Sequence, residues 1–179
     1  MTLRKHRQRF PDGLEHAHLS ERGVLGRHAS PVSVILLGAF LAVALAGFFG
    51  GGPRPEFTAT SDEASLSVKS PDVIRTGMYF EAEIAIMPKR PVSDLTLAVT
   101  PSLWRDFTQN TMIPAAAEES FENGFFRYSY GPAEPGKPLV VKIDFQINPS
   151  MIGTNRGVVA VFDGDRELVR LPLSTKVRP

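Results

Sequence analysis

The chain has 179 residues, no cysteine and a formal net charge of +1, and 42% of its residues are hydrophobic. The lack of cysteine excludes disulfides, thiolate metal sites and a cysteine nucleophile, so that an exported domain would be held by its apolar core alone. Residues 1–30 sum to +3 (six basic, three acidic) and residues 53–179 to −2 (14 basic, 16 acidic), and so balanced a C-terminal part predicts no nucleic-acid partner.

Residues 1–30 have the composition of a basic, disordered tail. All four histidines of the chain lie here, at His6, His16, His18 and His28. His16 and His18 could hold a metal ion loosely, but a solvated segment whose basic side chains contact anionic lipid headgroups is the better interpretation. Because no histidine follows, the C-terminal part lacks a Ser-His-Asp triad and the usual zinc hydrolase sites, and we expect no metal and no cofactor.

Residues 31–52 predict a transmembrane helix. Val32–Phe49 is free of charge, and as a helix it would be roughly 27 Å long, close to the hydrocarbon thickness of about 30 Å. We expect Gly50–Pro53 to end this helix. Basic residues before it place the N-terminus in the cytoplasm and the C-terminal part outside the cytoplasmic membrane.

A cleaved signal peptide is the alternative interpretation of this segment. Ala44-Leu45-Ala46 is an A-x-A pattern that a signal peptidase could cut. The pattern lies inside the apolar run, however, and the basic region before it is unusually long. The sequence therefore favours an uncleaved anchor and leaves cleavage after Ala46 open.

A stripe of small residues recurs every four positions in the same segment, at Gly38, Ala42, Ala46 and Gly50. Such a stripe allows two helices to pack closely in lipid. An alanine-rich segment also produces this spacing by chance. If the stripe is functional, the protein associates with a second copy or with another membrane protein.

After a linker at 53–64, residues 65–179 alternate with the period of two that is typical of half-buried strands. The pattern is clearest at Leu139–Ile147. Further strands are expected at 66–69, 80–86, 95–99, 125–130, 157–163 and 167–175. Asn123-Gly124 and Asp163-Gly164 are turn signals, and the second predicts a β-hairpin. Seven or eight short antiparallel strands without long helices predict an all-β sandwich.

The stretches PGKPLVVKIDFQINP and GVVAVFDGDRELVRLPL are similar to the last strands of bacterial sandwich domains. On these patterns residues 60–176 resemble an immunoglobulin-like or fibronectin-like ectodomain of a single-pass membrane protein. The resemblance concerns the fold, and such folds serve binding and structural roles alike. The cysteine pair of antibody domains is absent.

Residues 101–123 show no alternation, and we expect a long loop with one helical turn at 115–119. Trp104, Phe107 and Phe121 are its large apolar side chains. They either plug one end of the core or form an exposed contact surface for a partner. Asp163 and Asp165 could supply oxygens to calcium, although their place in a hairpin turn explains them sufficiently.

These patterns predict a non-enzymatic, single-pass protein of the cell envelope that acts as an accessory or assembly partner of another envelope protein. A module that binds a sugar, a peptide or an ion is the first alternative, and exposed rings at Trp104, Tyr128 and Tyr130 would favour it. A hydrolase that uses two carboxylates is the second alternative, although no pair of acids stands out.

Overall fold

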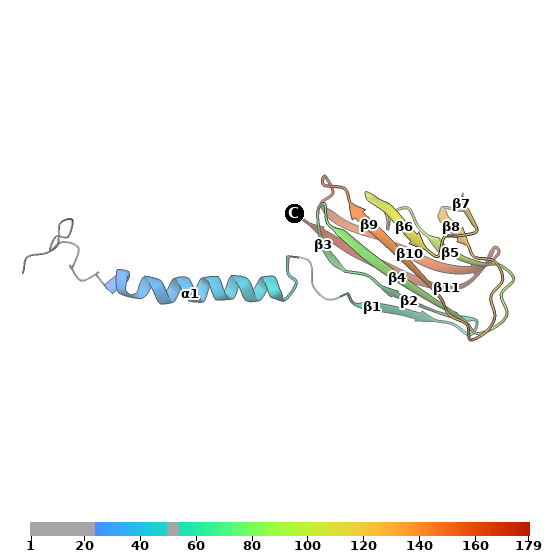
Figure 1. Cartoon of the computed structure of the whole chain (residues 1–179), viewed down its shortest axis with the longest axis horizontal. Coiled ribbons are helices and arrows are strands. Elements are labelled where there is room, and N and C mark those ends of the chain that lie inside the picture. Colours follow the sequence, from blue (N-terminus) through green and yellow to red (C-terminus); the bar gives the residue numbers. More distant parts are fainter. Residues whose placement is uncertain (1–23, 50–53) are drawn as a thin grey trace, which may run out of the picture. The chain divides into compact units, whose positions relative to one another are not determined.

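The computed structural model describes residues 24–49 and 54–179, with the side chains of residues 24–30 left aside. It contains one helix and eleven strands (Figure 1). The chain divides into two compact units, residues 1–42 and 43–179, which are considered separately. Most of the predicted tail, including His6, His16 and His18, lies outside the described residues.

The helix α1 covers Val24–Leu45 and differs at both ends from the predicted span 31–52. It contains Pro31 and stops well before Gly50–Pro53, so the prediction that this glycine-proline segment ends the helix is wrong. The side chains of Val32–Leu45 are almost all exposed. Among the residues that the structure describes, no helix is at once long enough and apolar enough to cross a membrane.

Gly47 closes α1. Its φ of 78° is left-handed, its N–H donates to the carbonyl of Ala44 at 3.0 Å, and the N–H of Phe48 donates to that of Val43 at 3.3 Å. These two bonds form a Schellman motif, which satisfies the last carbonyls of a helix. The helix therefore ends at the left-handed Gly47.

Two sheets pack face to face and form the rest of the described chain (Figure 1). Sheet A has the order β1-β2-β4-β9-β6, with β1 (Glu56–Thr60), β2 (Ala64–Lys69), β4 (Tyr79–Pro88), β9 (Leu139–Ile147) and β6 (Phe107–Ile113). Sheet B has the order β3-β11-β10-β5-β8-β7, with β3 (Val73–Arg75), β11 (Arg166–Arg178), β10 (Gly153–Asp163), β5 (Leu95–Val99), β8 (Phe125–Ser129) and β7 (Glu118–Glu122).

The core lies between the sheets and consists of the residues that alternate inward. In β9, Val141, Ile143 and Phe145 are at most 1% exposed, whereas the residues between them face solvent. Leu97 of β5 and Val161 of β10, a cross-strand pair of sheet B, bury the opposite side of the core. The predicted all-β sandwich and its seven principal strands are thus confirmed.

The structure corrects the prediction at four strands. β1 lies inside the predicted linker 53–64. β6 and β7 replace the loop and the helical turn that we expected at 101–123. β3 was missed as well, and it pairs with β11 in parallel, so the sandwich is not wholly antiparallel. All four lie at the edges of the sheets, where one or both faces meet solvent and alternation is weak.

Both glycine turns join antiparallel strands as the sequence indicates. Glu122 pairs with Phe125 across Asn123-Gly124, whose φ values are 51° and 79°. Positive φ at both central residues defines a type I′ turn, which Asn-Gly favours. In the β10–β11 hairpin, Gly164 has a φ of 59° and begins the two-residue loop.

Candidate functional site

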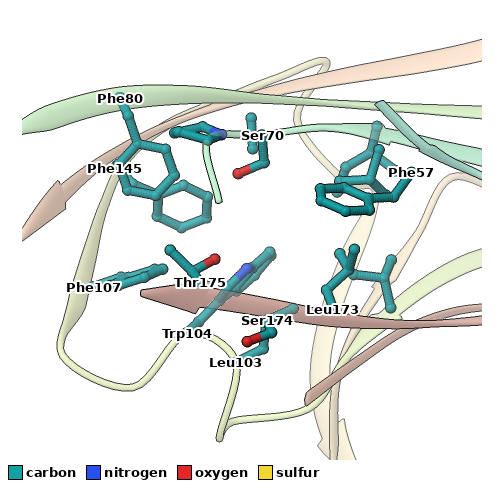
Figure 2. A pocket seen from close by; sticks show the side chains of 15 residues that line it. Phe57, Ser70, Phe80, Leu103, Trp104, Phe107, Phe145, Leu173, Ser174 and Thr175 are labelled. Atoms are coloured by element: carbon teal, nitrogen blue, oxygen red, sulfur yellow. The ribbon is translucent and has the colours of Figure 1, made fainter. Parts of the chain in front are cut away.

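Two of the three predicted contact residues point into the sandwich. The rings of Trp104 and Phe107 lie 5.0 and 5.8 Å from that of Phe145, and Phe80 stacks on Phe145 at 5.3 Å. Both residues are partly buried against the main core, and Figure 2 shows them around the same apolar space. Trp104 and Phe107 therefore plug one end of the core, which is the first of the two interpretations, and do not form an exposed surface.

Hydrogen bonds join the turn that carries Trp104 to β10. The backbone N–H of Val158 donates to the Thr100 hydroxyl at 2.9 Å, and the N–H of Thr100 donates to the Val158 carbonyl at 3.0 Å. Asn155, which is 1% exposed, donates from its side-chain amide to the carbonyl of Arg105 at 2.6 Å. These bonds join the backbone on both sides of Trp104 to β10.

The space beside these rings is too small for a ligand. Its cavity volume is about 30 Å³, room for roughly two water molecules, whereas ligand pockets usually measure at least about 300 Å³. The described residues that line it are apolar apart from Ser70, Ser174 and Thr175. The pocket thus contains no carboxylate pair and offers no room for a sugar or a peptide.

Tyr128 and Tyr130 do not form a stacking platform. Tyr128 is 7% exposed, and its hydroxyl lies 3.4 Å from Oε1 of Gln109 on β6. Tyr130 is half-buried, with its hydroxyl 3.3 Å from the sulfur of Met112. Burial raises the pKa of both to about 12, and the charge of Glu119 adds to the effect. Tyr128 is buried and Tyr130 is partly buried, which weakens the ligand-binding alternative.

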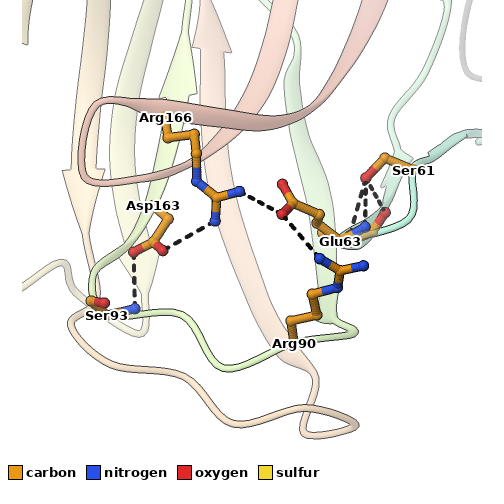
Figure 3. Close-up of polar contacts among 7 residues, drawn as sticks. Ser61, Glu63, Arg90, Ser93, Asp163 and Arg166 are labelled. Carbon is orange, nitrogen blue, oxygen red and sulfur yellow. Dashed lines mark hydrogen bonds and ion pairs between the residues drawn. The ribbon is translucent and has the colours of Figure 1, made fainter.

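Asp163 is engaged in an ionic network that joins three loops. Its Oδ1 accepts from the N–H groups of Ser93 and Asp94 at 2.9 and 3.1 Å, and Oδ2 lies 3.5 Å from Arg166. Arg166 also pairs with Glu63 at 2.5 Å (Figure 3). The N–H of Asp94 is the main cause that lowers the pKa of Asp163.

Asp165, the other proposed calcium ligand, is directed to a different partner. It is 90% exposed and lies 3.7 Å from Arg127. With Asp163 committed to the backbone of the β4–β5 loop, the two carboxylates do not converge. Among the described residues, no cluster of three or more His, Cys, Asp or Glu side chains has the arrangement of a metal site.

Arg127 lies nearly buried on the outer face of sheet B. Its side chain is 9% exposed, it donates to the carbonyl of Gly164, and its guanidinium group lies 4.9 Å from the ring centre of Phe162. Ser120 is the cross-strand neighbour of Arg127 on the adjacent strand β7. The guanidinium group of Arg127 thus already contacts the carbonyl of Gly164 and the ring of Phe162, and the carboxylate of Asp165 lies nearby.

Phe121, the third predicted contact residue, is exposed. It is 59% accessible and pairs across the hairpin with Phe126, which is 37% accessible, with ring centroids 5.3 Å apart. The contact between Tyr128 and Gln109 shows that β6, the last strand of sheet A, lies over β8 of sheet B. Sheet B continues one strand further, to β7. The two phenylalanines therefore face inward at a position that sheet A does not cover.

Three glutamates lie on β7 together with Phe121. Glu118, Glu119 and Glu122 are exposed and form no ion pair with any described residue. Ile113 at the end of β6 is 65% exposed. We call the surface formed by β7 and Phe126 the β7 edge, and it is the candidate functional site of the sandwich.

The predicted helix stripe is only partly described. Gly38 and Ala42 lie on α1, Ala46 follows the last helical residue, and Gly50 lies outside the described residues. A Cβ added at Gly38 would meet no atom within 4 Å, so the helix surface is open there. Helix packing through this stripe stays a prediction.

Sequence reasoning found Phe121 but missed Phe126. The sequence predicts a strand at 125–130 that contains Phe126, but it does not connect this residue with Phe121, because β7 shows no alternation. The signal that could have joined them was Asn123-Gly124, which places the residues on either side of it opposite each other in a hairpin.

The two sheets form a β-sandwich. No family model and no curated protein matches the chain. Solved structures that resemble it include the CARDB domain of the PF1109 protein from Pyrococcus furiosus, in complex with di-metal ions (14% identity, 68% of this chain and 90% of that one, TM-score 0.42). A FixG-related protein from Vibrio parahaemolyticus (11%, 66% and 100%, 0.42) and the chitin-binding domain of a Pyrococcus furiosus chitinase (16%, 62% and 97%, 0.40) are further examples. These likenesses carry no function to this chain.

Proposed function

We propose that this chain is a non-enzymatic accessory protein of the cell envelope, anchored by one membrane helix, whose β-sandwich binds another polypeptide through the β7 edge. The observation that carries the binding role is the exposed pair Phe121 and Phe126. Large aromatic side chains cost free energy in water, and they are enriched where proteins meet. The interior offers no comparable site, because its pocket measures only about 30 Å³.

The anchor rests on the apolar run Val32–Phe49. The helical part of this run, Val32–Leu45, has about 14 residues and would cover roughly 21 Å, which is less than the hydrocarbon thickness of about 30 Å. The proposal therefore requires Ala46–Phe49 to complete the span in a bilayer. The tail would lie in the cytoplasm and the sandwich on the opposite side.

Photo-crosslinking tests the binding role. A photoreactive amino acid at Phe121 of the full chain, expressed in cells, should give one reproducible crosslinked species. The same amino acid at Tyr79, which is 67% exposed at the start of β4, is the matched control and should give none. Equal crosslinking at both positions, or none at Phe121, would refute the proposed role of the β7 edge.

Membrane extraction tests the anchor. The full chain should stay in the membrane pellet at alkaline pH. The variant Leu36→Arg/Leu37→Arg should be released, because each arginine at the centre of a helix costs about 3 kcal/mol to insert. Leu36→Ala/Leu37→Ala is the matched control and should stay in the pellet. Release of the unaltered chain at alkaline pH would contradict the anchor without bearing on the β7 edge.

A further inference from the structure

The backbone of β7 forms an open edge of sheet B. β7 pairs with β8 on one side, and no described strand pairs with it on the other. Alternate N–H and C=O groups along such an edge are available to a further strand. Its five residues pair with β8 without a register shift, unlike those of β6 at the corresponding edge of sheet A, whose register shifts between Gln109 and Thr111.

The two faces of β7 differ in chemistry. Glu118, Ser120 and Glu122 share the outer face, as the pairing of Ser120 with Arg127 shows. Glu119 and Phe121 share the inner face, where Phe121 lies beside Phe126. A strand added along this edge would place its own alternate residues beside Glu118 and Glu122 on the outer face, and beside Glu119 and the aromatic rings on the inner face.

The carboxylates are available to a partner. None of the three glutamates is paired with a described cation, and Arg127 is already engaged by the carbonyl of Gly164. A second copy of the chain is a poor occupant. Antiparallel pairing of two β7 strands about Ser120 would set Glu118 opposite Glu122 twice, and like charges directly opposite are destabilising.

We infer that the β7 edge takes up an extended segment of a different polypeptide as an additional strand of sheet B, and that this segment alternates basic and apolar residues. This inference rests on the proposed function, since it names the chemistry of the partner. Backbone hydrogen bonds provide the affinity of such strand addition, and alternate side chains provide its specificity. The basic residues lie beside Glu118 and Glu122, and the apolar residues cover Phe121 and Phe126.

The probe is a short labelled peptide in which lysine and valine alternate, and its counterpart with glutamate in place of lysine is the control. Binding to the full chain in mild detergent is followed by fluorescence anisotropy. The lysine peptide should bind and the glutamate peptide should not. In Glu118→Lys/Glu122→Lys, affinity should fall at least about tenfold, because two favourable cross-strand charge pairs become repulsive.

Asp62→Lys/Glu134→Lys is the matched charge control, because it changes the net charge equally on other exposed loops. It should bind the peptide within about twofold of the unaltered chain. Equal loss in both double variants would mean that the peptide senses only net charge, and this would overturn the inference.

Hydrogen exchange on the unaltered chain avoids the use of variants. The lysine peptide should protect amides of β7, since strand addition engages its free N–H groups, and should leave those of β1 unchanged. Absence of protection in β7 would overturn strand addition. If the lysine peptide does not bind but crosslinking at Phe121 succeeds, strand addition is refuted and the proposed function is not. If crosslinking fails as well, the proposed function falls with it.

Discussion

Gly157 lies where β10 passes under the turn that carries Trp104, and a single added methyl group should be felt strongly there. A Cβ at this position would overlap the Thr100 hydroxyl and would lie 2.7 Å from Cβ and 2.9 Å from the backbone nitrogen of Leu103. The φ of Gly157 is not in the left-handed region, so the cost of Gly157→Ala is crowding alone.

The loss of stability can be worked out from the atoms that the added methyl group would displace. Overpacking by one methyl group in a fixed core costs about 1–3 kcal/mol. Displacing the Thr100 hydroxyl also breaks its bond from the N–H of Val158, which is worth about 1 kcal/mol. The sum is roughly 2–4 kcal/mol, and for a domain of this size the midpoint of thermal unfolding should fall by about 10 °C.

Thermal unfolding followed by the fluorescence of Trp104, the single tryptophan, measures this effect at the turn itself. Gly38→Ala is the control, because an added Cβ there meets nothing within 4 Å. In a Thr100→Ala background the penalty for Gly157→Ala should shrink, since one of the overlapping atoms is gone. A midpoint for Gly157→Ala within about one degree of the unaltered chain would refute the crowding argument.

Three further predictions concern titration and turns. The pKa of Asp163 is lowered, so its contribution to stability is complete above the usual carboxyl range and is lost as pH falls through the lowered value; the difference in unfolding midpoint between the unaltered chain and Asp163→Asn should therefore narrow as pH falls below that range. Tyr128 and Tyr130, whose pKa values are raised to about 12, should ionise only in strong alkali by ultraviolet titration, and the fold should lose stability between about pH 10 and 12. Gly124→Ala should cost roughly 1 kcal/mol in denaturant unfolding, because φ is 79° there.

The interior of the sandwich could be predicted from the sequence, because inner strands such as β2, β4 and β9 alternate between the core and the opposite face. Leu139–Ile147 is the clearest case, and its alternation matches the burial of β9 residue by residue. Edge strands lack this contrast. In β7 four of five residues are exposed, so neither face produces a pattern. The end of α1 cannot be predicted for a different reason, since Gly47 lies within an uninterrupted apolar run and nothing in that run marks it as the helix cap.

The candidate site was only half predictable. The aromatic side chains of residues 101–123 could be named, but composition does not separate a ring that plugs the core from one that is exposed. The ring of Trp104 lies 5.0 Å from that of Phe145, whereas Phe121 is 59% exposed. The difference is decided by which strands lie opposite, and that depends on pairings between distant parts of the chain.

The parallel pairing of β3 with β11 has a consequence for how the protein is made. β3 has no other neighbour in its sheet among the described strands, and its partner residues come about a hundred positions later in the chain. During synthesis β3 must therefore wait until the ribosome has passed β11. This edge of sheet B therefore depends on a pairing between distant parts of the chain, and such pairings form late in folding.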